Sequence, residues 1–264
     1  MASGRTPLLR VAPDAVLLAD EPLFRGDVRD LLDEVDRRRG TGRTLVTTPN
    51  VDQVLVLRND EAARRAHARA DLRTVDGLPI VALARLLGDH TVCRVTGADL
   101  LVACSAASAE RGWRIVVTGG APGTAVRAAE RLRTQHPGAD VQDVPFPDLA
   151  GGEDGGTVVE RLRAIRPDVV FLCLGSPKQE AWFLRWEDAL PDAVYVGAGA
   201  AVDFAAGARR RAPLLVQRLG LEWSWRLLQE PRRLAHRYLV RGPAFLLVVA
   251  RSLLAARGRR PDRA

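Results

Sequence analysis

Short apolar runs alternate along the chain with longer stretches in which apolar residues recur at every third or fourth position. The short runs predict strands, since they are rich in β-branched residues and bounded by turn formers. The expected strands are Thr44–Thr47, Asp71–Val75, Arg114–Thr118, Asp168–Leu174 and Ala193–Val196.

The stretches between these runs predict helices. The expected helices are Val51–Arg69, Gly97–Arg111, Thr124–Gln135 and Thr157–Arg166. Regular alternation of strands and helices is typical of an α/β fold, here a Rossmann-like, mostly parallel sheet flanked by helices. In such folds ligands bind at the carboxyl ends of the strands, where loops meet helix N-termini.

The pattern changes after Pro213. Leu214–Arg233 and Ala235–Ala256 predict helices rich in Leu, Trp and Arg, and Gly242 and Pro243 interrupt the second of them. We therefore expect an α/β domain over residues 1–212 and a basic, helical C-terminal appendage over residues 213–264.

The net charge of +7 on 264 residues is unevenly distributed. Residues 208–264 carry 14 Arg and three acidic residues, a net charge of +11, whereas the first 207 residues carry a net charge of −4. A basic segment of this kind suggests an anionic partner: nucleic acid, a membrane surface or a phosphorylated ligand. The chain has 38 Arg and one Lys, a bias that explains Arg over Lys but not the clustering.

Aromatic residues stand among the arginines of this segment. Trp223, Trp225 and Tyr238 suit an anionic membrane interface, where rings lie at headgroup depth and Arg meets phosphate. The alternative is a pair of amphipathic helices packed on the body or on another subunit. No run reaches the ~18–20 apolar residues that span a bilayer, and residues 1–15 lack a continuous apolar stretch. The expected location is the cytoplasm.

Metal-binding and nucleophile patterns do not stand out. The three Cys and four His are scattered, without the spacing of zinc ligands or of a disulfide framework. A nucleophile elbow of the GxSxG type is also missing from the sequence. We expect neither a metal nor a cofactor.

Polar residues follow two of the predicted strands. Asp76 comes directly after an apolar strand and before Gly77, so it is either a general base in a cleft or part of a turn or helix cap. Thr48 and Asn50 join a strand to a helix, where Asn50 caps the helix or both hydrogen-bond a sugar or amide.

Three glycine-rich loops also follow strands. Thr118–Ala125 is an anion-binding loop or only a tight turn. Gly175–Glu180 contains Lys178, the only lysine of the chain. Lys178 and Gln179 either bind a ligand or form the solvated start of a helix. In Gly197–Gly207, Asp203 is a site carboxylate or a structural cap.

Several of these stretches occur together in a recognisable order. They are TPN (Thr48–Asn50), DGLPIV (Asp76–Val81), RVTGADL (Arg94–Leu100), GSPKQE (Gly175–Glu180) followed by Trp182, GAGAAVDFAAG (Gly197–Gly207) and the block Arg210–Leu239. Through them, roughly residues 14–240 resemble the WecG/TagA/CpsF glycosyltransferase family, bacterial enzymes that make wall teichoic acid linkage units, enterobacterial common antigen and related polymers. The last block is the most specific.

The resemblance implies a metal-independent, inverting sugar transfer. The implied donor is a UDP-linked N-acetylmannosamine or its uronic acid, and the implied acceptor is N-acetylglucosamine on a polyprenyl diphosphate at the inner membrane face. Asp76 maps to the proposed base, and Thr48 and Asn50 map to pocket residues beside it. Arg94 and Gln179 map to substrate-binding positions, to which we add Lys178. The protein is then expected on the inner face of the cell membrane as a peripheral protein.

The leaving UDP gains negative charge, and without a metal arginines must stabilise it. The resemblance assigns this role to Arg226, Arg233 and Arg237 of the appendage. At His236 the sequence departs from relatives that carry Arg there, which leaves the set of phosphate-binding arginines open.

Other functions remain open at this point. The basic tail also fits a nucleic-acid-binding protein, although its arginines alternate with apolar residues as in an interface helix. The α/β body also fits a nucleotide-cofactor oxidoreductase, although a proper GxGxxG with a ribose-binding acid is missing. A homo-oligomer formed through the tail is compatible with glycosyl transfer. The transferred sugar and the polymer are not determined by the sequence.

Overall fold

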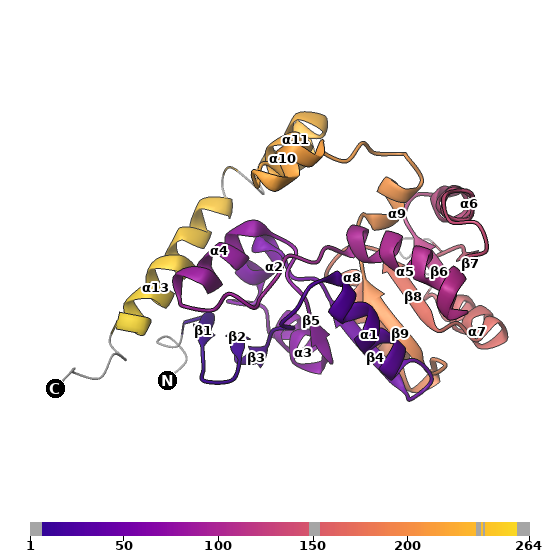
Figure 1. The fold of residues 1–264 in the computed structure, drawn as a ribbon, viewed down its shortest axis with the longest axis horizontal. Coiled ribbons are helices and arrows are strands. Elements are labelled where there is room, and N and C mark those ends of the chain that lie inside the picture. The colour runs from indigo at the N-terminus through magenta and orange to yellow at the C-terminus, as the bar shows by residue number, and fades with distance from the viewer. Residues whose placement is uncertain (1–6, 148–153, 236–238, 240, 258–264) are drawn as a thin grey trace.

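The computed structural model describes residues 7–147, 154–235, 239 and 241–257, without the side chains of residues 214, 218 and 233. Its main sheet has six parallel strands in the order β5-β4-β9-β8-β6-β7 (Figure 1). These strands are β4 (Arg43–Thr47), β5 (Leu72–Arg73), β6 (Arg114–Gly119), β7 (Asp140–Val144), β8 (Val169–Cys173) and β9 (Ala193–Gly197). The expected α/β fold with a Rossmann-like parallel sheet is confirmed.

Helices cover both faces of this sheet. One apolar core lies between the sheet and α1 (Val28–Arg38), α5 (Gly97–Arg111), α6 (Thr124–Gln135) and α9 (Ala201–Ala205). The other lies between the sheet and α7 (Gly156–Ile165) and α8 (Lys178–Trp186), with the turn η2 (Glu187–Ala189) after α8 and α3 (Glu61–Arg69) beside it. Every residue of β8 and β9 is buried, as expected for central strands covered on both sides.

A second, smaller layer adjoins the sheet. Its strands are antiparallel, β1 (Leu9–Val11), β2 (Val16–Leu18) and β3 (Glu21–Pro22). They share an apolar cluster with α2 (Val51–Val56), α4 (Leu78–Leu86) and α13 (Phe245–Arg257). The last long helix of the chain therefore packs on the first strands.

The C-terminal segment is helical, as expected. It consists of α10 (Leu214–Arg218), α11 (Glu222–Gln229), α12 (Pro231–Ala235), the turn η4 (Gly242–Ala244) and α13. Figure 1 shows it leaving α9, passing through α10 and α11 and ending with α13 beside α4 and β1. Among the described helices, none combines the length and apolar character needed to cross a bilayer. The division into two domains at residue 212 stays a prediction.

Two neighbouring strands send the chain to opposite faces of the sheet. β6 leads into α6 on one face, and the adjacent β8 leads into α8 on the other. The loops that leave such a pair diverge and open a crevice at the carboxyl edge, where open α/β sheets bind ligands.

Some elements differ from those expected. The helix expected over Val51–Arg69 is two helices, because the side chain of Asp60 accepts a hydrogen bond from the Ala63 amide and starts α3 anew. Strand β7 was not expected, since its sequence DVQDV mixes polar and apolar residues. It is an edge strand, so packing requires only part of it to be apolar.

Candidate active site

Asp76 lies where the chain turns from a strand into a helix. Val75 forms an isolated parallel bridge with Arg94, just beyond β5, and the Asp76 amide donates to the Pro49 carbonyl at 2.9 Å. Gly77 follows with φ +154° and leads directly into α4. The carboxylate is therefore held at the carboxyl edge of the sheet, as the sequence predicted.

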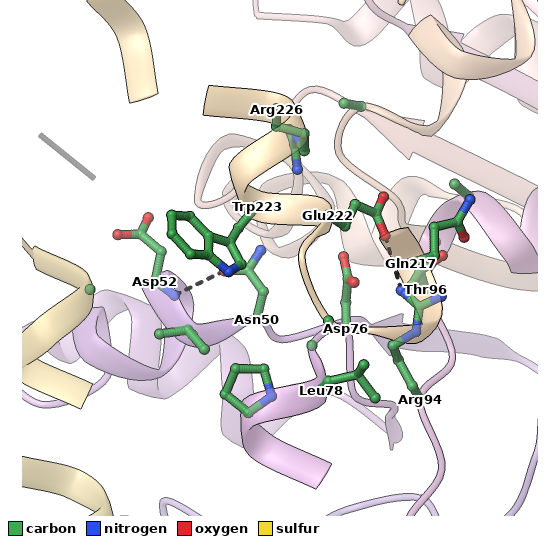
Figure 2. Close-up of a pocket in the computed structure, with 18 of the residues that line it drawn as sticks. Asn50, Asp52, Asp76, Leu78, Arg94, Thr96, Gln217, Glu222, Trp223 and Arg226 are labelled. Atoms are coloured by element: carbon green, nitrogen blue, oxygen red, sulfur yellow. Dashed lines mark hydrogen bonds and ion pairs between the residues drawn. The ribbon is translucent and has the colours of Figure 1, made fainter. Parts of the chain in front are cut away.

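A cavity of about 400 Å³ surrounds this carboxylate. Part of its wall is formed by Asn50, Asp76 and Arg94 of the α/β body, residues 1–212. Another part is formed by Glu222 and Arg226 of the appendage. Figure 2 shows these side chains converging from opposite sides. The cavity lies between the sheet edge and the seated appendage.

The environment of Asp76 makes it a candidate base. Burial, and then the negative charge of Glu222, raise its pKa from 3.8 to about 6, against the opposing effect of Arg94 and Arg226. A carboxyl with this pKa is mostly ionised at neutral pH and yet binds a proton more tightly than an ordinary aspartate. That combination is what general base catalysis near neutrality requires.

An ion-pair network joins the body to the appendage at this cavity. Arg94 pairs with Glu222 at 3.1 Å and with Asp99 at 3.6 Å. Arg211 pairs with Asp99 at 2.6 Å and approaches Glu222 at 3.8 Å. Arg94 and Arg211 are each less than a quarter exposed. Such pairs are less screened by solvent than surface pairs.

A second cavity, of about 710 Å³, opens at the carboxyl ends of β6, β8 and β9. Gly119, Gly120 and Gly175 line it, together with Lys178 and Arg209. It occupies the crevice between the diverging loops of β6 and β8. Ala200, at the start of α9, lines both cavities, so the two adjoin.

A model of the glycosyl transferase WecG/TagA/CpsF family matches residues 18–259 of the 264. The chain belongs to this family of glycosyltransferases. The resemblance drawn from its motifs is confirmed. Membership makes the protein a glycosyltransferase of cell-surface polysaccharide synthesis, a class that in general uses a sugar-nucleotide donor and a lipid-linked acceptor.

In this glycosyltransferase, Asn50 lines the cavity of Asp76 and also caps α2. Its side chain accepts hydrogen bonds from the Asp52 and Gln53 amides, so the cap is formed, and contact with a sugar stays a prediction. Thr48 is buried, and its hydroxyl donates to the Gly197 carbonyl at 2.9 Å. It joins the ends of β4 and β9.

Neither Gln179 nor Lys178 lines the cavity of Asp76. Gln179 is 2% exposed; it accepts from the Gly199 amide at 3.1 Å and donates to Glu180 at 3.0 Å. A Cβ on Gly197 would lie 2.6 Å from the Gln179 amide nitrogen, so the two residues are in close contact. Gln179 therefore fixes the loop after β9, while Lys178 faces the second cavity.

The predicted arginines of the appendage are described in part. Arg226 lines the cavity of Asp76, and its guanidinium lies 5.9 Å from the centre of the Phe204 ring. Arg233 belongs to α12, but its side chain is outside the described part of the structure. Arg237 and His236 lie outside the described residues. Their predicted contact with phosphate stays a prediction.

Sequence reasoning missed the acidic partners of the appendage. Glu222 pairs with Arg94, and Glu230 pairs with Arg209 at 2.8 Å, while Arg209 also pairs with Asp203 at 3.3 Å. The signal that points to them is their rarity, since residues 208–264 contain only three acids. In the described ranges, no three His, Cys, Asp or Glu side chains gather in a group suited to a metal ion.

Proposed function

We propose that the protein is an inverting glycosyltransferase that moves an N-acetylmannosamine-type sugar from a UDP-sugar to N-acetylglucosamine on a polyprenyl diphosphate. The observation that carries the proposal is Asp76, a carboxylate with a pKa near 6 in a cavity that adjoins the crevice of the sheet. A base next to a nucleotide-sized crevice is the arrangement that glycosyl transfer to a hydroxyl requires.

The crevice suits the donor. Glycine loops after β6 and β8 let a phosphate approach backbone amides closely, and Lys178 supplies positive charge. Asp203 is a carboxylate acceptor for hydrogen bonds from the nucleoside. The transferred sugar would then extend past Ala200 toward Asp76, where the acceptor enters from the 400 Å³ cavity.

The reaction is a single displacement. Asp76 takes the proton of the acceptor hydroxyl while the oxygen attacks the anomeric carbon from the face opposite UDP. The bond between the anomeric carbon and the phosphate oxygen breaks, and UDP leaves with the electron pair, so the configuration inverts. Arg226, with Arg233 and Arg237 as predicted partners, stabilises the charge that develops on the diphosphate. The proposed chemistry uses no metal and no cofactor.

The exposed apolar side chains of the appendage support contact with a membrane. Leu215, Leu228 and Leu254 are 69%, 80% and 65% exposed, and arginines lie near them in the sequence. Leucines at the acyl boundary and arginines at lipid phosphates bind an anionic surface. We place the protein on the inner face of the cell membrane, where a polyprenyl-linked acceptor is found.

Family membership favours this function over nucleic acid binding and over an oxidoreductase. Several basic residues of the region 208–264 are also engaged within the chain. Arg209 and Arg211 pair with acids of the body, and Arg241 pairs with Asp52 at 3.1 Å. Such pairing leaves less charge for a nucleic acid backbone.

A transfer assay tests the proposal. Purified protein receives a short-chain lipid diphosphate N-acetylglucosamine and a panel of UDP-sugars, without added metal and with EDTA. We expect turnover with an N-acetylmannosamine-type donor and a loss of about 10²–10⁴-fold in Asp76→Asn. Lack of turnover with every donor would contradict the proposed function, and full activity of the variant would remove Asp76 as the base.

A further inference from the structure

Glu222 is an acidic residue in the most basic part of the chain, and it faces the predicted base. It begins α11, and Figure 2 shows its side chain above Asp76 with an ion pair to Arg94. The 3.1 Å pair with Arg94 and the 3.8 Å approach to Arg211 both cross from the appendage to other segments of the site. The proposed displacement does not use this carboxylate.

The surroundings of Asp76 explain why an acid there matters. Positive charge comes from Arg94, Arg226 and Arg211, and negative charge comes from Glu222 and Asp99. An arginine that pairs directly with a carboxylate lowers the pKa of that carboxylate by about 1–3 units. A base weakened in this way takes a proton less readily from a sugar hydroxyl.

The pairs of Arg94 keep its guanidinium occupied. Asp99 of the body holds one terminal nitrogen at 3.6 Å, and Glu222 of α11 holds the other at 3.1 Å. Glu222 is the shorter of these two contacts, and Asp99 is shared with Arg211 at 2.6 Å. Lifting α11 off the body would leave Arg94 beside Asp76 with only its longer, shared contact to Asp99.

We propose that Glu222 is a positioning residue that keeps Arg94 from pairing with Asp76, so that Asp76 is a strong base only while α11 is seated on the body. This inference rests on the proposed function, in which Asp76 is the base. It links catalysis to the position of the appendage and so guards against hydrolysis of the donor when the site is open.

The other end of α11 supplies a matched comparison. Glu230 follows α11 and pairs with Arg209, which lines the second cavity. Glu222→Gln and Glu230→Gln each remove one carboxylate of the appendage that pairs with arginine of the body. Only the first lies beside Asp76.

The first test is the pH profile of kcat/KM. In Glu222→Gln we expect the midpoint of the acidic limb to move to a pH about one unit lower. The plateau value of kcat/KM should fall about tenfold, because Arg94 then weakens Asp76 as a base. Glu230→Gln should lower the plateau without moving the acidic limb. Glu222→Asp keeps the negative charge, so its acidic limb should lie at the pH of the wild type. An acidic limb that stays in place in Glu222→Gln would overturn the proposal.

The second test does not depend on activity. Titration of the Asp76 carboxyl by ¹³C NMR, assigned by its loss in Asp76→Asn, follows the same group in every variant. If Glu222 acts through Arg94, Glu222→Gln should shift this titration less than half as far in an Arg94→Gln background as in the wild type. Equal shifts of the Asp76 titration in both backgrounds would mean that Glu222 acts only by direct repulsion of Asp76. That result would overturn the positioning role.

The two proposals fail in different ways. If the wild type transfers no sugar to any acceptor, the proposed function fails, while the NMR titration still decides the role of Glu222. If the wild type transfers sugar and Glu222→Gln leaves both the limb and the titration in place, only the inference about Glu222 fails.

Discussion

At the scale of single residues, the carboxylate proposed as the base destabilises the folded chain above its pKa. Asp76 has a pKa of about 6 in the folded chain and an ordinary value of 3.8. The folded state therefore binds this proton more tightly than the unfolded state. Ionised Asp76 lowers the free energy of unfolding above about pH 6, and the effect fades as the pH falls and disappears below about pH 3, where the carboxyl is protonated in both states.

Asp76→Asn should therefore stabilise the protein while it slows transfer. The difference of about two pKa units corresponds to at most about 3 kcal/mol, so we expect a gain of about 1–3 kcal/mol in the free energy of unfolding at pH 8. Urea denaturation at pH 8 and pH 4 measures it, and most of the gain should be lost at pH 4, close to the ordinary pKa of 3.8. Equal stability of variant and wild type at both pH values would contradict the raised pKa.

Asn50 offers a test that separates capping from substrate contact. Asn50→Ala removes the cap of α2 and a wall residue of the cavity, whereas Asp60→Ala removes only the cap of α3. Both should lose about 1 kcal/mol of stability by thermal or urea unfolding. Only Asn50→Ala should also raise the KM for the acceptor, and equal kinetics in the two variants would reduce Asn50 to a cap.

At the scale of elements, close contact between strand ends shapes the second cavity. Gly119 has φ +98°, and a Cβ there would lie 2.6 Å from the Cys173 carbonyl oxygen on the neighbouring strand. Gly175 also has a positive φ, of +77°, but nothing lies within 4 Å of its Cβ position. The first glycine is required by backbone conformation and by space, and the second by conformation alone.

Alanine at these two positions should therefore have different effects. Gly175→Ala is expected to cost about 1–2 kcal/mol through its positive φ. Gly119→Ala adds a clash with a backbone carbonyl and should cost about 2–4 kcal/mol, and it should also raise the KM for the donor. Urea unfolding and donor titration measure both. Equal losses of unfolding free energy in the two variants would mean that the ends of β6 and β8 can move apart to accept the Cβ.

How far the sequence predicted this arrangement depends on the kind of contact. The central strands were predicted because each is a short apolar run, and Asp76 was found because it ends such a run. Edge strand β7 and the three short strands β1–β3 were missed, since they carry little periodic signal. Arg94 was predicted, but its partner Glu222 lies 128 residues away and is brought near only by the seated appendage.

At the scale of the whole molecule, the appendage lines the cavity of Asp76 and then packs on the small sheet through α13. Its acids Glu222 and Glu230 pair with arginines of the body, while Leu215, Leu228 and Leu254 are largely exposed. The same segment thus contributes to the cavity wall and carries exposed apolar side chains. We expect these leucines to meet the membrane on which we place the acceptor.

A vesicle assay tests this orientation. Leu247 and Leu254 of α13 are 54% and 65% exposed, so Leu247→Ser with Leu254→Ser should spare stability and weaken binding to vesicles of anionic phospholipid by about tenfold or more. Val102→Ser, at an exposed position of α5, is the control and should bind as the wild type does. Cosedimentation at two salt concentrations measures binding. Unchanged binding of the double variant would exclude α13 as the contact.

The packing of α13 has a consequence for how the appendage is studied. Phe245 and Val248 are 6% and 3% exposed and lie in one cluster with Leu9, Val16 and Leu18. Burial of each such side chain is worth about 1.5–3 kcal/mol. A truncation before α10 would uncover the N-terminal strands as well as remove α11. Loss of activity in that truncated protein would not distinguish a missing catalytic contribution from a damaged scaffold, so single substitutions on α11 are the informative experiment.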